Sequence, residues 1–168
     1  MRRAVGAVVL MAAGAVVAQP ERVVITGSIS AQRVIDAPYA IGTVDSDSLR
    51  AAGPMVHLAE ALQRVPGVVV NDRGNFAQDL QISSRGFGAR ASFGVRGIRL
   101  VADGIPASGP DGQGQVSQFD LAGAQRVEVL RGPLSVLYGN GSGGVISIVS
   151  APVTHSGAAA ALDVGRLG

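Results

Sequence analysis

The sequence predicts a domain of the α/β (α+β) class, built on a small mixed sheet with short helices, and three observations support this prediction. Short β-prone runs alternate with short amphipathic stretches along most of the 168 residues. Glycine is abundant, with 24 residues, as expected where turns need positive φ and backbones pack closely. Only 15% of the residues are charged and 4% are aromatic, and both shares are low for a soluble domain. We therefore expect a compact body that is inserted into something else.

The first eighteen residues are typical of an export signal. Two arginines precede an uncharged run over residues 4–18, which ends at a small-residue cleavage site before Gln19. This run of about 15 residues is short of the roughly 20 that a membrane-spanning helix needs, and a buried N-terminal helix is the alternative. All 14 basic residues are arginines, so cleavage leaves 14 − 2 = 12 of them against 12 acidic residues. The mature net charge is then zero, which excludes a global basic patch for nucleic acid.

Residues 21–27 form a short β-prone segment, and the polar stretch 28–38 is typical of a flexible tether. Residues 40–44 predict a strand. The residues Asp45-Ser46-Asp47-Ser48 offer helix N-caps, so we expect a brief helix after them that ends at Gly53.

The region 55–64 is the best helix candidate of the mature chain, because apolar residues recur there at three- and four-residue spacing. Pro66-Gly67 ends it. Residues 68–70 predict a short buried strand, residues 72–75 a turn, and residues 81–84 a half-exposed strand.

Eight glycines fall within residues 86–114, too many for regular elements throughout. Inside this region, residues 98–102 predict a strand that the hairpin dipeptide Asp103-Gly104 closes. Residues 109–114 predict an exposed loop.

The last part of the chain predicts a short helix over residues 117–124 with Leu121 turned inward, and a strand over residues 126–130. Gly132-Pro133 breaks this strand before a helical turn. A tight glycine loop at residues 139–144 then leads into the last clear strand, residues 145–149.

The residues offer little for catalysis or metal binding, and no cofactor is implied. There is no cysteine, and the two histidines and three glutamates are scattered. The loop at residues 139–144 resembles a phosphate-binding loop only loosely, because a strand rather than a helix is expected after it. The loop leaves open one alternative, a nucleotide-using enzyme. That alternative requires a helix directly after the loop. We expect no enzyme.

The arginines are more informative. Arg73, Arg90 and Arg96 lie in or beside glycine-rich turns, where a cation can face an anionic ligand. Arg85 and Arg131 each end a predicted strand and precede a glycine. An arginine at a strand end can reach out of a small body to a carboxylate on an enclosing wall. A solvated surface arginine is the alternative for each of them.

Four stretches in order along the chain carry a resemblance to a known family: Glu21-Arg22-Val23-Val24-Ile25-Thr26, LAEALQRVPGV at residues 58–68, ISSRGFG at residues 82–88, and RVEVLRGPLSVLYG at residues 126–139 with GGVISI at residues 143–148. They resemble the N-terminal part of TonB-dependent outer-membrane receptors. The first stretch is similar to the TonB box, and the others are similar to segments of the plug domain. In the third stretch, Ser84 replaces the apolar residue that is usual before the arginine.

The resemblance implies a plug fold, a small mixed four-stranded sheet with short helices that blocks a barrel of about 22 strands. It implies a function in gating the energy-coupled uptake of ferric siderophores or similar iron chelates. The implied partners are TonB with its inner-membrane energising complex, a β-barrel, and the ferric chelate. The implied location is the cell outer membrane, with no role in nucleic-acid binding.

The resemblance also assigns roles to single residues. Coupling to TonB falls on Glu21, Arg22, Val23, Val24, Ile25 and Thr26. Pairing with barrel glutamates, the plug–barrel lock, falls on Arg85 and Arg131. The apices that face the ligand carry Arg73, Asn75, Phe76, Arg90, Asp111 and Gln113.

The expected domain organisation is a signal peptide at residues 1–18, the TonB box and tether at 19–38, the plug at 39–152, and the start of a barrel at 153–168. Only 168 − 149 = 19 residues follow Val149, whereas such a barrel needs on the order of 220 residues in strands. We therefore expect a truncated receptor or a fragment that cannot transport by itself. The alternative is a free periplasmic ligand-binding domain without a barrel.

Overall fold

The computed structural model describes residues 23–24, 32–72, 74, 78–92, 94–132, 135–139, 141–154, 156–158, 160 and 162. The expected signal peptide therefore lies outside the described residues. Among the described residues, no helix has the length and apolar character needed to cross a membrane.

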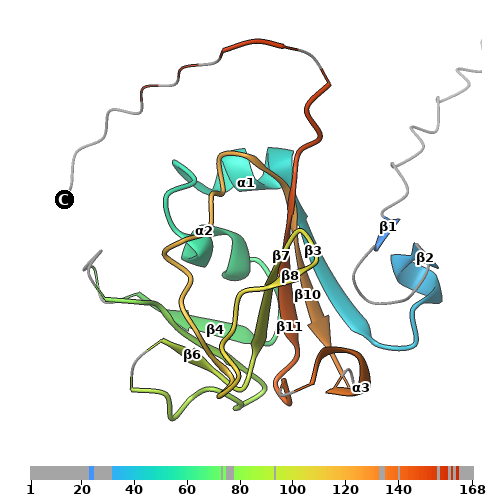
Figure 1. Cartoon of the computed structure of the whole chain (residues 1–168), viewed down its shortest axis with the longest axis vertical. Helices are drawn as coiled ribbons and strands as arrows, with labels where there is room; N and C mark the ends of the chain where they lie inside the picture. Colours follow the sequence, from blue (N-terminus) through green and yellow to red (C-terminus); the bar gives the residue numbers. More distant parts are fainter. Residues whose placement is uncertain are drawn as a thin grey trace, which may run out of the picture.

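A mixed sheet of five strands forms the centre of the molecule (Figure 1). Its order is β3-β10-β11-β7-β8, with β11 and β7 parallel and the other neighbours antiparallel. The expected four-stranded mixed sheet is present, and a two-residue strand at its edge adds a fifth. The bounds are β3 (Ala40–Asp45), β7 (Arg99–Ala102), β8 (Ile105–Pro106), β10 (Ala124–Arg131) and β11 (Val145–Ser150).

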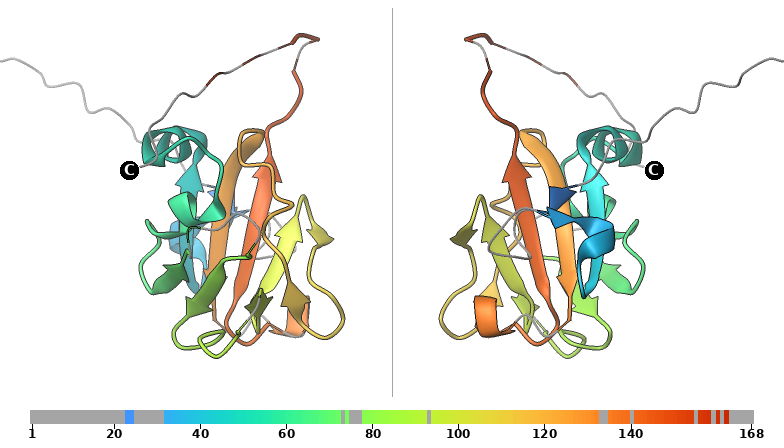
Figure 2. Two further views of the ribbon diagram at one scale, coloured as in Figure 1. Left: turned by 90° about the vertical axis from the view of Figure 1, so that its left-hand side faces the viewer. Right: turned by 90° about the vertical axis from the view of Figure 1, so that its right-hand side faces the viewer.

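Smaller elements pack around this sheet. The β-ribbon of β4 (Val68–Asn71) and β5 (Gln81–Ser84) lies on one side of it, and β6 (Val95–Arg96) pairs with β9 (Gln113–Gly114). Figure 2 shows that helices α1 (Ser46–Ala52) and α2 (Leu58–Leu62) lie on one side of the sheet. Strands β1 (Val23–Val24) and β2 (Gln32–Arg33) lie on the other side. The chain leaves β11 at the end of the sheet where α1 lies, opposite the end where β6 and α3 lie (Figure 1).

The first described strands cover part of the expected box and tether. Strand β1 (Val23–Val24) pairs antiparallel with β2 (Gln32–Arg33), and the 3₁₀ turn η1 (Val34–Asp36) follows. The end of the expected tether is therefore structured. An ion pair between Arg33 Nε and Asp36 Oδ2 at 2.7 Å closes the turn, and Val34 packs against the sheet.

Helix α1 (Ser46–Ala52) begins where its sequence predicts, because Asp45 Oδ1 accepts a hydrogen bond from the Ser48 amide at 2.9 Å. Helix α2 (Leu58–Leu62) is shorter than the expected helix over residues 55–64. The reason is Glu60, whose carboxylate accepts hydrogen bonds from the three amides before the helix, at 2.8 to 3.1 Å. These residues wrap around Glu60 instead of joining the helix. A third helix, α3 (Ser135–Tyr138), is a single turn.

Two expectations about local structure are wrong. The strand at residues 68–70 is only half buried, because Val68 and Val70 pack against the core whereas Val69, on the opposite face, is 57% exposed. Residues 117–123 form turns and irregular structure and not a helix, and Ala124 already belongs to β10. The Asp120 carboxylate accepts hydrogen bonds from the amides of Ala122 and Gly123, a local bond that competes with helix formation. Leu121 is nevertheless buried, as expected.

The central strands bury side chains on both faces. Val127, Val129 and Ile146 point into the large core beneath α1 and α2, whereas Leu130 and Val145 contribute to a smaller core with Tyr39 and Tyr138. Because both faces are covered, β10 carries no solvent-exposed stripe despite its alternating sequence. This rigid centre positions the glycine-rich loops at its ends.

Candidate functional site

Arg85 lies at the tip of a two-residue hairpin. Ser84 and Phe87 exchange backbone hydrogen bonds of 2.9 and 3.0 Å, and the residues between them, Arg85 and Gly86, have φ of 51° and 87°. Hairpin turns with two positive φ angles favour Asn-Gly or Asp-Gly, and the chain uses Asp-Gly at its other such turn. An arginine at this position is strained.

Arg131, the last residue of β10, approaches the same place from another strand. Its Nη1 donates a hydrogen bond to the carbonyl of Pro66, and the Arg85 amide donates to the carbonyl of Gly67 at 3.3 Å. The side chain of Arg85 is exposed, whereas Nε of Arg131 is buried and has no hydrogen-bond partner. The Arg131 guanidinium and the Arg85 backbone amide therefore contact neighbouring residues of the Pro66-Gly67 turn, and we call these two residues the arginine pair.

The sequence did not indicate this meeting point. Pro66-Gly67 is recognisable as a helix stop, but nothing in the local pattern connects it to Arg131, 65 residues further along the chain. The Pro66-Gly67 turn, which contacts the Arg85 amide and the Arg131 side chain, was not predicted as part of the lock.

A second candidate site is a pocket of about 570 Å³ beside this hairpin. Two of the predicted ligand-facing residues, Arg90 and Gln113, line it. The volume is within the range of roughly 300–1,000 Å³ that is usual for small-molecule sites. The complete lining is Gly86, Phe87, Gly88, Arg90, Ala91, Ser92, Arg96, Gly97 and Gln113.

Arg96 links the pocket to the loop opposite. Its Nη2 donates to Gln113 Oε1 at 3.3 Å and lies 4.0 Å from Asp111 Oδ2. Asp111 is therefore next to the pocket without lining it. Arg90, Arg96 and Asp111 together give this region a net positive charge, which favours an anionic ligand. Phe87, 49% exposed, supplies an aromatic wall. The predicted residues Arg73, Asn75 and Phe76 lie outside the described residues.

Arg96 also lines the pocket. Its place beside a glycine turn marks it as a possible anion contact in the sequence, but the family resemblance gives it no role. The pairing of β6 with β9 brings it to Gln113.

Of the six predicted coupling residues, Val23 and Val24 are described. They pair with Arg33 and Gln32. Glu21, Arg22, Ile25 and Thr26 lie outside the described residues.

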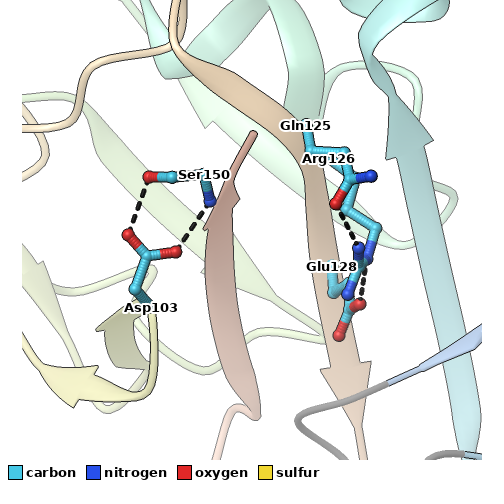
Figure 3. A network of polar contacts seen from close by, with 5 residues as sticks. All are labelled: Asp103, Gln125, Arg126, Glu128 and Ser150. Carbon is cyan, nitrogen blue, oxygen red and sulfur yellow. Dashed lines mark hydrogen bonds and ion pairs between the residues drawn. The ribbon is translucent and has the colours of Figure 1, made fainter. Parts of the chain in front are cut away.

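Two further polar contacts lie on the central sheet (Figure 3). Glu128 is fully buried and its Oε1 accepts from Arg126 Nε at 2.5 Å. The carboxylate of Asp103 accepts from both the amide and the hydroxyl of Ser150 at 2.7 Å. The hydrogen bond from the Ser150 amide has the largest effect and that from the hydroxyl the next largest, and together they hold the pKa of Asp103 below its usual value. Asp103 thereby ties the β7–β8 turn to the end of β11.

The glycine loop at residues 139–144 leads directly into strand β11 at Val145. The helix N-terminus that a nucleotide phosphate would need is not at this place, so the nucleotide-using enzyme is excluded as a reading of this loop.

Comparison with known proteins agrees with this geometry. The family model described as "TonB-dependent Receptor Plug Domain" matches residues 33–146. The ferric enterobactin receptor PfeA from Pseudomonas aeruginosa superposes with a TM-score of 0.52 and 26% identity over 70% of this chain and 18% of that chain.

Two further structures share the fold. The siderophore receptor PirA from Acinetobacter baumannii has a TM-score of 0.51 and 24% identity, over 68% of this chain and 17% of its own. The RagAB peptide importer has a TM-score of 0.57 and 21% identity, over 82% and 15%. The chain therefore spans less than a fifth of the length of these solved proteins.

Proposed function

Because the chain belongs to the family of TonB-dependent receptor plug domains, which are parts of transporters and not enzymes, we propose that it gates the energy-coupled uptake of a ferric siderophore or similar iron chelate. Its partners are then a surrounding β-barrel in the cell outer membrane, and TonB with its inner-membrane energising complex. The proposed division is a signal peptide at residues 1–18, box and tether at 19–38, plug at 39–152, and the start of a barrel at 153–168.

The observation that carries the proposal is the arginine pair. A strained turn holds Arg85 exposed. The Arg131 guanidinium is hydrogen-bonded to the carbonyl of Pro66, which lies 65 residues earlier in the sequence. Arginines presented in this way suit bidentate pairing with carboxylates. We assign them to the plug–barrel lock, in which barrel glutamates hold the plug in place.

The pocket supports an anionic solute. Arg90 lines it from a turn and Arg96 from strand β6, and Gln113 adds a hydrogen-bonding group. A ferric chelate with carboxylate or catecholate oxygens presents the negative charge that these side chains would bind. Arg73, Asn75 and Phe76 complete the proposed ligand-facing apices together with Asp111.

Coupling to TonB is proposed for residues 21–26. Val23 and Val24 already adopt the extended backbone that strand addition uses. To add a strand to TonB, β1 must part from β2, and a pairing of only two residues on each strand makes this separation easy.

The coupling is tested by a pull-down of the chain with the periplasmic domain of TonB. The variant Val24→Pro removes a main-chain donor and is expected to lose the complex. The matched variant Val24→Thr keeps a β-branched residue and the amide, and it should retain the complex. Equal recovery of both variants would contradict the box assignment.

Calorimetric titration separates the plug from the alternative, a free periplasmic ligand-binding domain. Ferric enterobactin, the iron-free siderophore and a short peptide are each titrated into the chain alone. Because barrel walls supply much of a plug's ligand site, we expect weak or no binding. Tight binding of ferric enterobactin to the chain alone would favour the free domain.

A further inference from the structure

A row of polar side chains crosses the centre of the five-stranded sheet on one face. Glu128 of β10 lies directly opposite Thr43 of β3 on one side and Ser147 of β11 on the other. Residues that pair directly on neighbouring strands turn their side chains to the same face. Arg126, two residues before Glu128, shares this face and donates from Nε to Glu128 Oε1 at 2.5 Å (Figure 3). We call these four residues the polar row.

The polar row is buried but incompletely hydrogen-bonded. Glu128 and Ser147 are fully buried, and the Arg126 side chain is 15% exposed. Among the residues that the structure describes, Arg126 Nη2 and Ser147 Oγ are buried atoms without a hydrogen-bond partner. A buried polar atom of this kind costs free energy, because it has given up its hydrogen bonds to water. Sealing this face against water is therefore unfavourable at two atoms of the row.

The beginning of the described chain lies on the same side of the sheet. Strand β10 points Val127 and Val129 into the large core, so Glu128 between them points the other way. Strands β1 and β2 lie on this other side (Figure 2), and Val34, directly after β2, packs against the small core there. We call β1, β2 and η1 together the N-terminal cover.

The apolar contact between the N-terminal cover and the sheet is small, as far as the described side chains show. Val34 is half-buried, whereas Arg33, Ile35 and Asp36 are exposed. One half-buried valine contributes little burial free energy. A cost of sealing polar atoms beneath the cover can therefore decide whether the cover stays in place.

We propose that the N-terminal cover is detachable, and that the polar row keeps it so by favouring the state in which water reaches Arg126 Nη2 and Ser147 Oγ. An apolar row at the same place would hold the cover on the sheet. Strand β1 belongs both to the cover and to the segment proposed to bind TonB, so detachment makes that segment available for strand addition. This consequence rests on the proposed function, whereas the detachment itself does not.

Thiol labelling measures the detachment. The chain has no cysteine, so Val34→Cys places a single thiol at the half-buried position of the cover. Its rate of reaction with iodoacetamide reports how often the cover leaves the sheet. The rate is compared in this background with and without Ser147→Ala. The matched control is Ser84→Ala, because Ser84 also has a buried hydroxyl without a partner but belongs to β5, which packs against the large core through Ile82.

We expect Ser147→Ala to slow the labelling at least about fivefold, since it removes an unpartnered hydroxyl from the covered state. Ser84→Ala should leave the rate unchanged. An unchanged rate in Ser147→Ala, or equal slowing in the two serine variants, would overturn the role of the polar row. If Ser147→Ala fails to fold, the double variant Arg126→Met with Glu128→Leu tests the same prediction, because it makes the row apolar at two other positions.

A pull-down with the periplasmic domain of TonB separates this inference from the proposed function. Ser147→Ala, without the cysteine, should recover less of the complex than Ser84→Ala does. Slower labelling in Ser147→Ala but no complex with any variant would contradict the coupling and leave the detachable cover standing. A complex with the unsubstituted chain but unchanged labelling in Ser147→Ala would overturn the cover and leave the coupling standing. Slower labelling with equal recovery would show that TonB binds β1 without detaching the cover.

Discussion

Arg131 donates a hydrogen bond from Nη1 to the backbone carbonyl of Pro66, a residue 65 positions earlier in the chain. This contact fastens the end of the central strand β10 to the turn between α2 and β4. A displacement of that turn therefore reaches Arg131 directly, without passing through the core.

Arg85→Asn is expected to stabilise the fold, because asparagine tolerates the positive φ of this turn better than arginine does. The free energy of unfolding in urea should rise by about 1 kcal/mol. Arg85→Lys keeps the strained backbone and should leave the stability unchanged. A loss of stability in Arg85→Asn would mean that the arginine side chain supports the fold itself.

Asp103→Asn should lower stability at neutral pH and have little effect in acid. The folded pKa of Asp103 lies below the usual value because Ser150 donates two hydrogen bonds to the charged carboxylate. The stabilisation is therefore complete above the unfolded pKa of about 3.9 and is lost as the pH falls through the lower folded value.

Urea unfolding of Asp103→Asn and of the unsubstituted chain between pH 7 and pH 2 measures this difference. Asparagine is suited to the turn, so the backbone is not disturbed. A difference in stability that stays constant down to pH 2 would contradict the role of the charge.

Arg126→Ala should destabilise the chain by about 3–5 kcal/mol, because it removes the cation beside the fully buried Glu128 carboxylate. The double variant Arg126→Met with Glu128→Leu removes both charges and should cost much less. Equilibrium unfolding of the two variants measures both costs. A single variant no less stable than the double one would show that the carboxylate is stabilised by other groups.

Gly88→Ala and Gly97→Ala separate backbone strain from crowding in the wall of the pocket. Both glycines have positive φ, but a Cβ at Gly88 would lie 2.5 Å from the Ile82 carbonyl, whereas one at Gly97 has no neighbour within 4 Å. Gly88→Ala should therefore cost about 2 kcal/mol more, since overpacking against backbone cannot relax easily. Similar unfolding midpoints would indicate that the hairpin beside the pocket can shift.

The local elements were predictable where one signal dominates. Asp45 caps α1 as its sequence indicates, and Asp103-Gly104 closes the β7–β8 hairpin. Prediction failed where a carboxylate competes with the helix for backbone amides. Glu60 shortens α2, and Asp120 replaces a helix with turns.

The candidate residues of the lock came from the sequence, whereas their arrangement in space did not. Arg85 and Arg131 are marked by strand ends followed by glycine, and by the family resemblance. Their contacts with Pro66-Gly67 depend on tertiary packing between distant segments, for which periodicity and turn chemistry carry no signal. Arg96 joins the pocket only because β6 pairs with β9.

The strand order of the central sheet has a consequence for how the chain acquires its structure. Strand β3 pairs with β10, more than 75 residues later, and β7 pairs with β11. During synthesis or threading from the N-terminus, neither early strand of these pairs has its partner until β10 and β11 have emerged. Because these pairings join segments far apart in the sequence, we expect the sheet to fold slowly. The central sheet therefore stays incomplete until the chain has been made as far as the end of β11 at Ser150.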